Sequence, residues 1–102
     1  MKTDYEMIFC IVNSGFSETV MDAARGAGAR GGTVLRGRGT AKKDAEEAFG
    51  ITIQPDKEIV LILVPREIKD NVLEALYHSS GLGSAGHGIA FSLPVDRTVG
   101  LS

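Results

Sequence analysis

A glycine-rich segment with two arginines holds the residue types that point most directly to chemistry. Gly37, Arg38 and Gly39 follow a strand-like segment, and Arg36 precedes them. Glycine lets backbone amides approach a phosphate closely, and guanidinium groups donate forked, charge-assisted hydrogen bonds to it. The segment predicts an anion site, although it has neither a Walker motif nor a complete Gly-x-Gly-x-x-Gly pattern. In the alternative interpretation, the glycines only turn the chain and the arginines are solvated.

A second glycine cluster spans residues 81–88 and ends in Gly86, His87 and Gly88. It holds more glycine than the end of a helix needs, and His87 can offer a donor to a phosphate or a ribose. We expect that this cluster and the turn after Gly37 do not share an end of the sheet within one chain. Only the cluster of a neighbouring subunit would lie beside that turn. The alternative is a flexible connection between a helix and a strand.

Catalytic and metal chemistry are not predicted. The single cysteine, Cys10, lies in an apolar run, where it behaves as a small hydrophobe. His78 and His87 share no ligand spacing with each other or with Cys10, so they indicate no zinc site. No nucleophile is paired with a base in a recognisable motif. We therefore expect no catalytic residue, no metal and a protein that is not an enzyme.

The composition is that of a folded globular chain. Its 102 residues suit one domain, 1–102, and 43% of them are hydrophobic and 24% charged. A formal charge of -2 lacks the basic excess of a generic nucleic-acid binder. The longest apolar runs, 7–12 and 59–65, are far shorter than a membrane span. We expect a cytoplasmic protein without nucleic acid as a partner.

Hydrophobic patterning predicts an α+β fold of βαββαβ order. Two strongly apolar runs favour central strands, and two segments with helical spacing favour helices. This order matches the ferredoxin-like plan, a four-stranded antiparallel sheet with two helices. The predicted strands are 6–12, 31–36, 58–64 and 88–95, with 6–12 and 58–64 central; the predicted helices run from an N-cap at Ser17 to Gly26 and from after Pro65 to Gly81.

Two features exceed what a single copy of this plan explains. Both faces of 6–12 and 58–64 are apolar, whereas two helices cover one face of the sheet. A homo-oligomer with its sheets packed inward would cover the other face. The connection at 38–57 is also far longer than a hairpin loop, and loops of this length are usually functional.

The sequence resembles the P-II nitrogen-regulatory signalling proteins over nearly its whole length. The most specific element is the glycine loop before the last strand, which is similar to the nucleotide-embracing B-loop of that family, and segment 38–57 is similar to its T-loop. The matching residues are Phe16, Gly31, Thr33-Val34, Gly37-x-Gly39, Val64-Pro65 and Gly83-x-x-Gly86-x-Gly88.

The resemblance implies a homotrimeric signal transduction protein without enzymatic activity. It implies an adenine nucleotide (AMP, ADP or ATP) bound between subunits, and a T-loop that docks on a regulated membrane transporter or enzyme in nitrogen or related metabolism. The ligand-binding positions that the resemblance implies are Thr33, Gly37, Arg38, Gly39, Val64, Gly86, His87 and Gly88.

The chain also departs from the family pattern, as a divergent member would. Ile89 stands where the family usually has a lysine, and Arg97 is the one basic residue left after the last strand. Arg97, with Arg36 and Arg38, can partly compensate, and the effector can be a mononucleotide or another small anion. No tyrosine lies within 38–57, which excludes uridylylation there.

Two other functions fit the same scaffold, a small enzyme and an RNA-binding module. Neither has a supporting motif, because no carboxylate pair flanks a glycine loop and the two central strands offer only Phe9 for base stacking.

Overall fold

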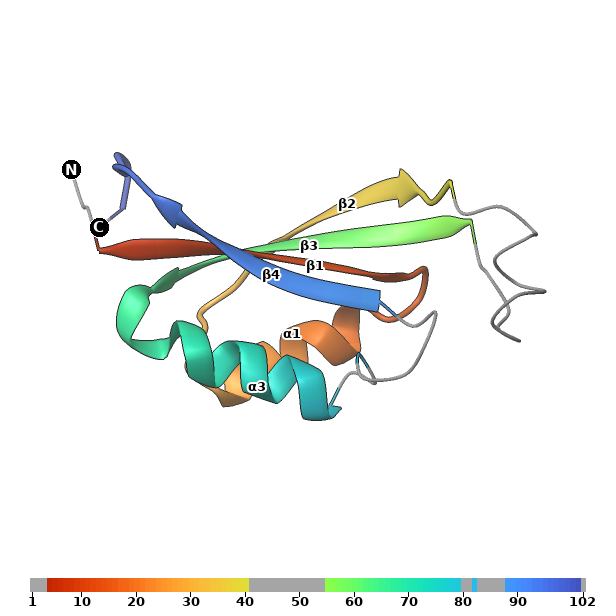
Figure 1. Cartoon of the computed structure of the whole chain (residues 1–102), viewed down its shortest axis with the longest axis horizontal. Coiled ribbons are helices and arrows are strands. Elements are labelled where there is room, and N and C mark those ends of the chain that lie inside the picture. Colours follow the sequence, from red (N-terminus) through yellow and green to blue (C-terminus); the bar gives the residue numbers. More distant parts are fainter. Residues whose placement is uncertain (1–3, 41–54, 80–81, 83–87, 102) are drawn as a thin grey trace.

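The computed structural model describes residues 4–40, 55–79, 82 and 88–101. The α+β class and the βαββαβ order predicted from the sequence are confirmed (Figure 1). In chain order, the elements are β1 (Tyr5–Asn13), α1 (Ser17–Gly26), β2 (Thr33–Arg38), β3 (Asp56–Pro65), the short 3-10 helix η1 (Arg66–Ile68), α3 (Lys69–Ser79) and β4 (Gly88–Val95).

The four strands form one antiparallel sheet in the order β2-β3-β1-β4. The apolar strands β1 and β3 are central, and the shorter β2 and β4 lie at the two edges, as predicted. We call the end with Asn13, Lys57 and Gly37 the Gly37 end, and the end with Tyr5 and Pro65 the terminal end. At about 3.4 Å per residue, the length of β1 separates these two ends by about 27 Å.

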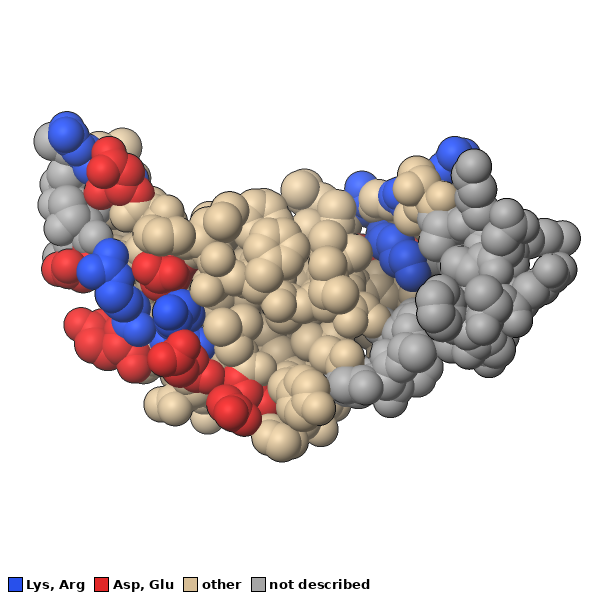
Figure 2. Space-filling view, viewed as in Figure 1, with Lys and Arg blue, Asp and Glu red and all other residues tan. Residues whose placement is uncertain are grey.

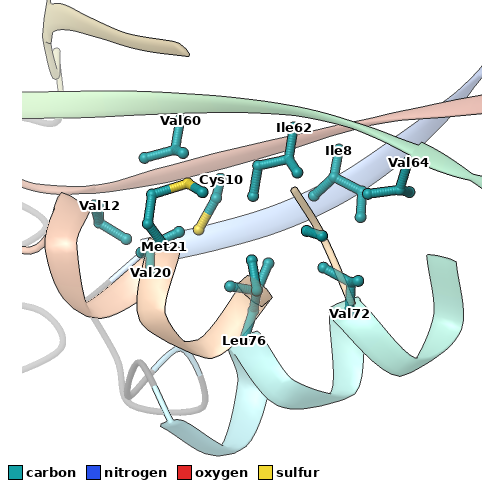
Figure 3. Packing of buried hydrophobic residues seen from close by; sticks show 12 residues of the cluster. Ile8, Cys10, Val12, Val20, Met21, Val60, Ile62, Val64, Val72 and Leu76 are labelled. Carbon is teal, nitrogen blue, oxygen red and sulfur yellow. The ribbon is translucent and has the colours of Figure 1, made fainter. Parts of the chain in front are cut away.

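The core lies between one face of the sheet and the two helices (Figure 3). Alternate residues of the central strands point into it because side chains in a strand alternate between faces. Burial raises the pKa of the Cys10 thiol to about 11, so this cysteine packs as a neutral hydrophobe. Fully buried core residues include Ile8, Cys10, Val12, Val20, Ala24, Val60, Ile62, Val64, Val72 and Leu76.

The opposite face of the sheet is apolar and is left uncovered by α1 and α3, which both lie on one side of it (Figure 1). On β4, Ile89 is 57% exposed and Phe91 is 39% exposed. Phe91 stacks on Phe9 of β1 with ring centroids 5.2 Å apart. On the central strands, the residues that alternate with the buried ones are also apolar, which confirms the prediction that both faces are apolar: Met7, Phe9, Ile11, Ile59, Leu61 and Leu63.

Two local predictions are wrong. The second strand begins at Thr33 and ends at Arg38, rather than covering 31–36, so Gly37 and Arg38 belong to the strand and not to the turn after it. Ser17 does not cap α1: it is the first helical residue, and the N-cap residue Phe16 makes no capping hydrogen bond with its side chain.

Glu58 of β3 accepts hydrogen bonds at the start of α1, as the side chain of an N-cap residue would. Its Oε1 accepts hydrogen bonds from the backbone N–H of Gly15, at 2.8 Å, and of Ser17, at 3.3 Å. These bonds satisfy amides at the start of α1 and join that helix to the sheet. The Gly15 amide, followed by the Ser17 amide and hydroxyl and the positive charge of Arg36, lowers the pKa of the Glu58 carboxyl.

Glu58→Gln is expected to make the stability of the protein less dependent on pH. Glutamine keeps an acceptor oxygen but loses the charge, so the free energy of unfolding at pH 7 should fall. The loss should be only about 0.5–1 kcal/mol, because solvent screens the charge of this partly exposed group. A carboxyl whose pKa is lowered by folding stabilises the protein above its unfolded-state pKa of about 4.3, and this contribution is lost as the pH falls through the folded-state pKa.

Urea unfolding of both proteins between pH 3 and pH 7 measures this effect. The difference between them should shrink below about pH 4, as the wild-type carboxyl takes up its proton. Asp22→Asn, which alters the exposed Asp22–Arg25 pair of α1, serves as the control with little change. A difference that stays constant over the whole range would contradict the role given to the Glu58 charge.

Candidate functional site

Four of the predicted site residues lie together at the Gly37 end. Arg36, Gly37 and Arg38 are the last residues of β2, and Gly39 follows them. The Gly39 N–H donates to the carbonyl of Pro55 at 2.7 Å, which keeps the two chains together one residue beyond the strand pair. This is the segment in which the sequence predicts an anion site.

The strand register puts the arginines and the glycines on different faces. Arg36 lies opposite Glu58, and Arg38 lies opposite Asp56. Since neighbours directly across a strand pair share a face, both guanidinium groups are on the helix side of the sheet, each near a carboxylate. Gly37 is on the uncovered side. The arginines therefore do not flank the glycine backbone in the way that the sequence pattern suggested.

Lys57 is a cation at this end that the sequence analysis missed. It lies opposite Gly37, on the uncovered side of the sheet, and its Nζ donates to Asn13 Oδ1 at 2.6 Å. Its stem passes beside Gly39, where an added Cβ would be 3.0 Å from Lys57 Cε. The third strand was expected to begin at Glu58, so Lys57 was assigned to the connection. A strand starting earlier would have revealed it as the neighbour of Gly37.

The charges at the Gly37 end leave a small positive excess. Among the described residues of the β2–β3 pair, Arg36 and Arg38 face the carboxylates Glu58 and Asp56, and Lys57 adds a third cation opposite Gly37. Lys57 has neutral cross-strand neighbours, Asn13 and Gly37, so its charge is the least compensated of the three. An anion at this end would therefore gain most from Lys57 on the uncovered side of the sheet.

The prediction that the two glycine clusters share an end of the sheet only between subunits is wrong. Gly88, the first residue of β4, lies opposite Val12, and Arg38 lies opposite Asp56, so the start of β4 and the end of β2 are at the same end of one chain. They are nevertheless at opposite edges, and three strand spacings of about 4.8 Å put them about 14 Å apart. Gly86 and His87 lie outside the described residues.

The remaining predicted residues are elsewhere. The Val64 side chain is 0% exposed, on the helix side of the sheet, while its neighbour Leu63 is on the uncovered face. Thr33 lies opposite Leu61, near the middle of the sheet. Arg97 follows β4 at the terminal end, where its Nε is 3.6 Å from an Asp96 oxygen.

A hollow at the terminal end is a further candidate that sequence reasoning missed. Its volume is about 440 Å³, and it combines an aromatic ring, a guanidinium group and exposed glycine backbone with apolar walls. Such a mixture suits a small ligand with an apolar part and a negative charge. It is lined by Tyr5, Gly28, Arg30, Gly31, Leu63, Pro65, Gly100 and Leu101.

Neither a metal-binding cluster nor a membrane-spanning helix is found among the described residues. In the part of the chain that the structure describes, no group of three or more His, Cys, Asp or Glu side chains is placed to hold a metal ion. Among the described helices, none has the length and apolar character needed to cross a membrane.

Comparison with solved structures identifies a similar fold. The chain is similar to the crystal structure of Arabidopsis thaliana PII bound to citrate, with a TM-score of 0.70 and 24% sequence identity over 93% of this chain and 78% of that one. At this identity the likeness shows the fold, a ferredoxin-like sheet with two helices. No family model matches the sequence, and no curated protein matches it.

Gly88→Ala is expected to destabilise the fold itself. Gly88 has a φ of +147°, and a Cβ there would be 2.5 Å from the Ile11 carbonyl oxygen. Backbone must therefore move, which should lower the free energy of unfolding by about 2 kcal/mol or more. Gly26→Ala, where a Cβ meets nothing within 4 Å, is the matched control and should be neutral or stabilising. Equal stability of the two variants in urea would contradict this assignment.

Proposed function

We propose that this protein is a P-II-like signal transduction protein without enzymatic activity. It binds an adenine nucleotide or a similar small anion between copies of a homotrimer, and it regulates a partner, a membrane transporter or an enzyme, through segment 38–57. The observation that carries the proposal is the division of the candidate residues between the two ends of a sheet whose second face is apolar and uncovered.

The division of residues favours a site between subunits. Lys57 and Gly37 are about 27 Å from the hollow around Tyr5 and Arg30, too far for one small ligand to touch both within a chain. A ligand that contacts both groups must lie between two copies. Such a contact joins unlike surfaces, and repeated contacts of that kind form a ring of identical subunits when the rotation between neighbours closes.

The uncovered face supplies a reason for the copies to associate. Its exposed side chains include Leu35 at the β2 edge and Ile89, Phe91 and Leu93 at the β4 edge, and Phe91 stacks on Phe9 of β1. A contiguous apolar surface of this kind is typical of an interface. Packing three such faces against one another would bury the apolar residues that the helices leave open.

The chemistry of the two candidate regions supports a small anionic effector. Lys57 supplies an ammonium group at the Gly37 end, and Arg30 supplies a guanidinium group beside the Tyr5 ring at the other. The structurally similar Arabidopsis thaliana protein is a PII bound to citrate, itself a small anion. An aromatic or apolar wall with nearby cations also suits a nucleotide, because its base packs on the wall and its phosphates pair with the cations.

One observation favours RNA binding as a second candidate function. The stacked Phe9–Phe91 pair lies on the uncovered sheet face, where RNA-binding modules of this topology place their aromatic residues. The negative net charge of the chain disfavours RNA, and the apolar neighbours of the pair favour a protein interface instead. Binding of a uridine oligonucleotide, abolished by Phe91→Ala, would support this second function.

Phe91→Glu is expected to break the assembly into monomers. A carboxylate in the centre of the apolar face would have to be buried without a partner, which costs several kcal/mol. Sedimentation velocity at micromolar concentration should give a trimer for the wild type and a single subunit for the variant. Tyr77→Glu, an exposed position on α3, is the control and should sediment as the wild type. A wild-type protein that sediments as a single subunit would exclude the proposed site.

Calorimetry with AMP, ADP, ATP and citrate tests the effector site. Lys57→Met and Arg30→Met should each weaken binding about tenfold to 100-fold, the usual result of removing a charge-assisted contact. Arg25→Met on α1 is the control and should bind as the wild type. In trimers assembled from both variants together, some interfaces contain an intact Lys57 and an intact Arg30, so part of the wild-type binding should return. No recovery would place the site within one chain, and no binding by the wild type would exclude these effectors.

A further inference from the structure

An apolar groove runs between α3 and the edge strand β4. Its volume is about 370 Å³ and it is open to solvent. Tyr77, which is 56% exposed, forms part of its wall. Of the Gly37 end, the groove includes Gly88 but neither Lys57 nor Gly37. The lining residues are Leu73, Tyr77, Leu82, Gly88, Ile89 and Ala90.

The strand beside this groove is an edge strand of the described sheet. β4 pairs with β1 on one side, and within the described residues no strand pairs with its other side. The outward N–H and C=O groups of such an edge strand can pair with an added extended segment. A groove next to a free edge therefore fits an extended peptide, whose backbone extends the sheet while its side chains fill the hollow.

The rim of the groove is acidic. A second hollow shares Leu73 and Tyr77 with the groove and is also lined by Asp70 and Glu74. Both carboxylates are largely exposed, and their ion pairs, with Lys69 at 3.5 Å and with His78 at 3.1 Å, are surface pairs that contribute little. Figure 2, viewed with α3 and β4 in front, shows tan surface in the middle of the molecule, with red atoms, and some blue ones, to its left and lower left.

We propose that the α3–β4 groove binds an extended peptide segment of a partner protein, in which a short apolar stretch adjoins Lys or Arg. The apolar stretch packs against Leu73, Tyr77 and Ala90, and the basic residues reach Asp70 and Glu74. Exposed tyrosine at the centre of such a surface is typical of residues that dominate binding. This inference does not depend on the proposed effector site.

Fluorescence anisotropy with labelled synthetic peptides tests the proposal on the full-length protein in its native assembly. The probe TVLVTKRK carries the apolar stretch and the basic residues. TVLVTEDE reverses its charges, and TVPVTKRK interrupts its strand with proline, which removes a backbone donor. The first peptide should bind at least tenfold more tightly than either of the others.

Substitutions on the exposed surface locate the binding. Tyr77→Ser should weaken binding of the first peptide about tenfold. Asp70→Asn combined with Glu74→Gln should weaken it severalfold and reduce its dependence on salt, because the basic residues lose their partners. Glu18→Gln combined with Asp22→Asn removes the same charge from α1 and is the matched control, with unchanged binding.

Three results would overturn the proposal. Equal affinity for the three peptides would show that charge and strand pairing do not matter. Unchanged binding by Tyr77→Ser would place the peptide elsewhere. Dissociation of the native assembly by Tyr77→Ser would show that a second copy of this chain, rather than a partner protein, occupies the groove. Circular dichroism of each variant confirms that the fold is intact, since all of these side chains are at the surface.

Discussion

Two helices can cover only one face of a four-stranded sheet, and in this protein both faces of the central strands are apolar. Ile8 and Ile62 are buried beneath α1 and α3, while Phe9 and Leu61, their neighbours in the chain, point the other way. At about 25 cal/mol per Å² of apolar surface, leaving the second face in water forgoes a large part of the stabilisation available to a small domain. Association with further copies recovers it, so the pleat of the central strands is the physical reason to expect an assembly.

The same sheet also decides how a ligand site can be built. A rigid sheet holds the Gly37 end and the terminal end about 27 Å apart, and no side chain spans that distance. Under the proposed function, Lys57 at one end and Arg30 at the other would be two half-sites of one chain. In the proposed homotrimer, assembly through the apolar face and completion of a ligand site would be linked, because a contact that buries Phe91 would also bring the half-sites of different copies together.

The fold could be predicted from the sequence because hydrophobic periodicity, glycine and proline all agreed on the same elements. The site could be predicted only in part. Residues 58–64 form a continuous apolar run, and such a run does not show which residues face the helices, since the alternation that reveals the pleat is absent. Val64 is named as a ligand position by the family resemblance alone; its side chain faces the helices, and that of its neighbour Leu63 faces the uncovered side. The cap of α1 was missed because the acceptor, Glu58, is 41 residues away from Ser17 in the sequence, beyond the reach of any local pattern.

Glycines near a candidate site have two possible causes, and the surroundings of each one separate them. At Gly88 a Cβ would meet the backbone oxygen of Ile11 at 2.5 Å, so the fold alone requires glycine there. At Gly37 the nearest atom is the flexible tip of Ile59, 3.0 Å away, and at Gly39 it is the Lys57 stem, so both neighbours can move. Packing therefore explains Gly88 fully but explains Gly37 and Gly39 only weakly. Close approach of another molecule to the backbone is the physical reason that is left for these two glycines, which lie beside Lys57 and its neutral cross-strand neighbours.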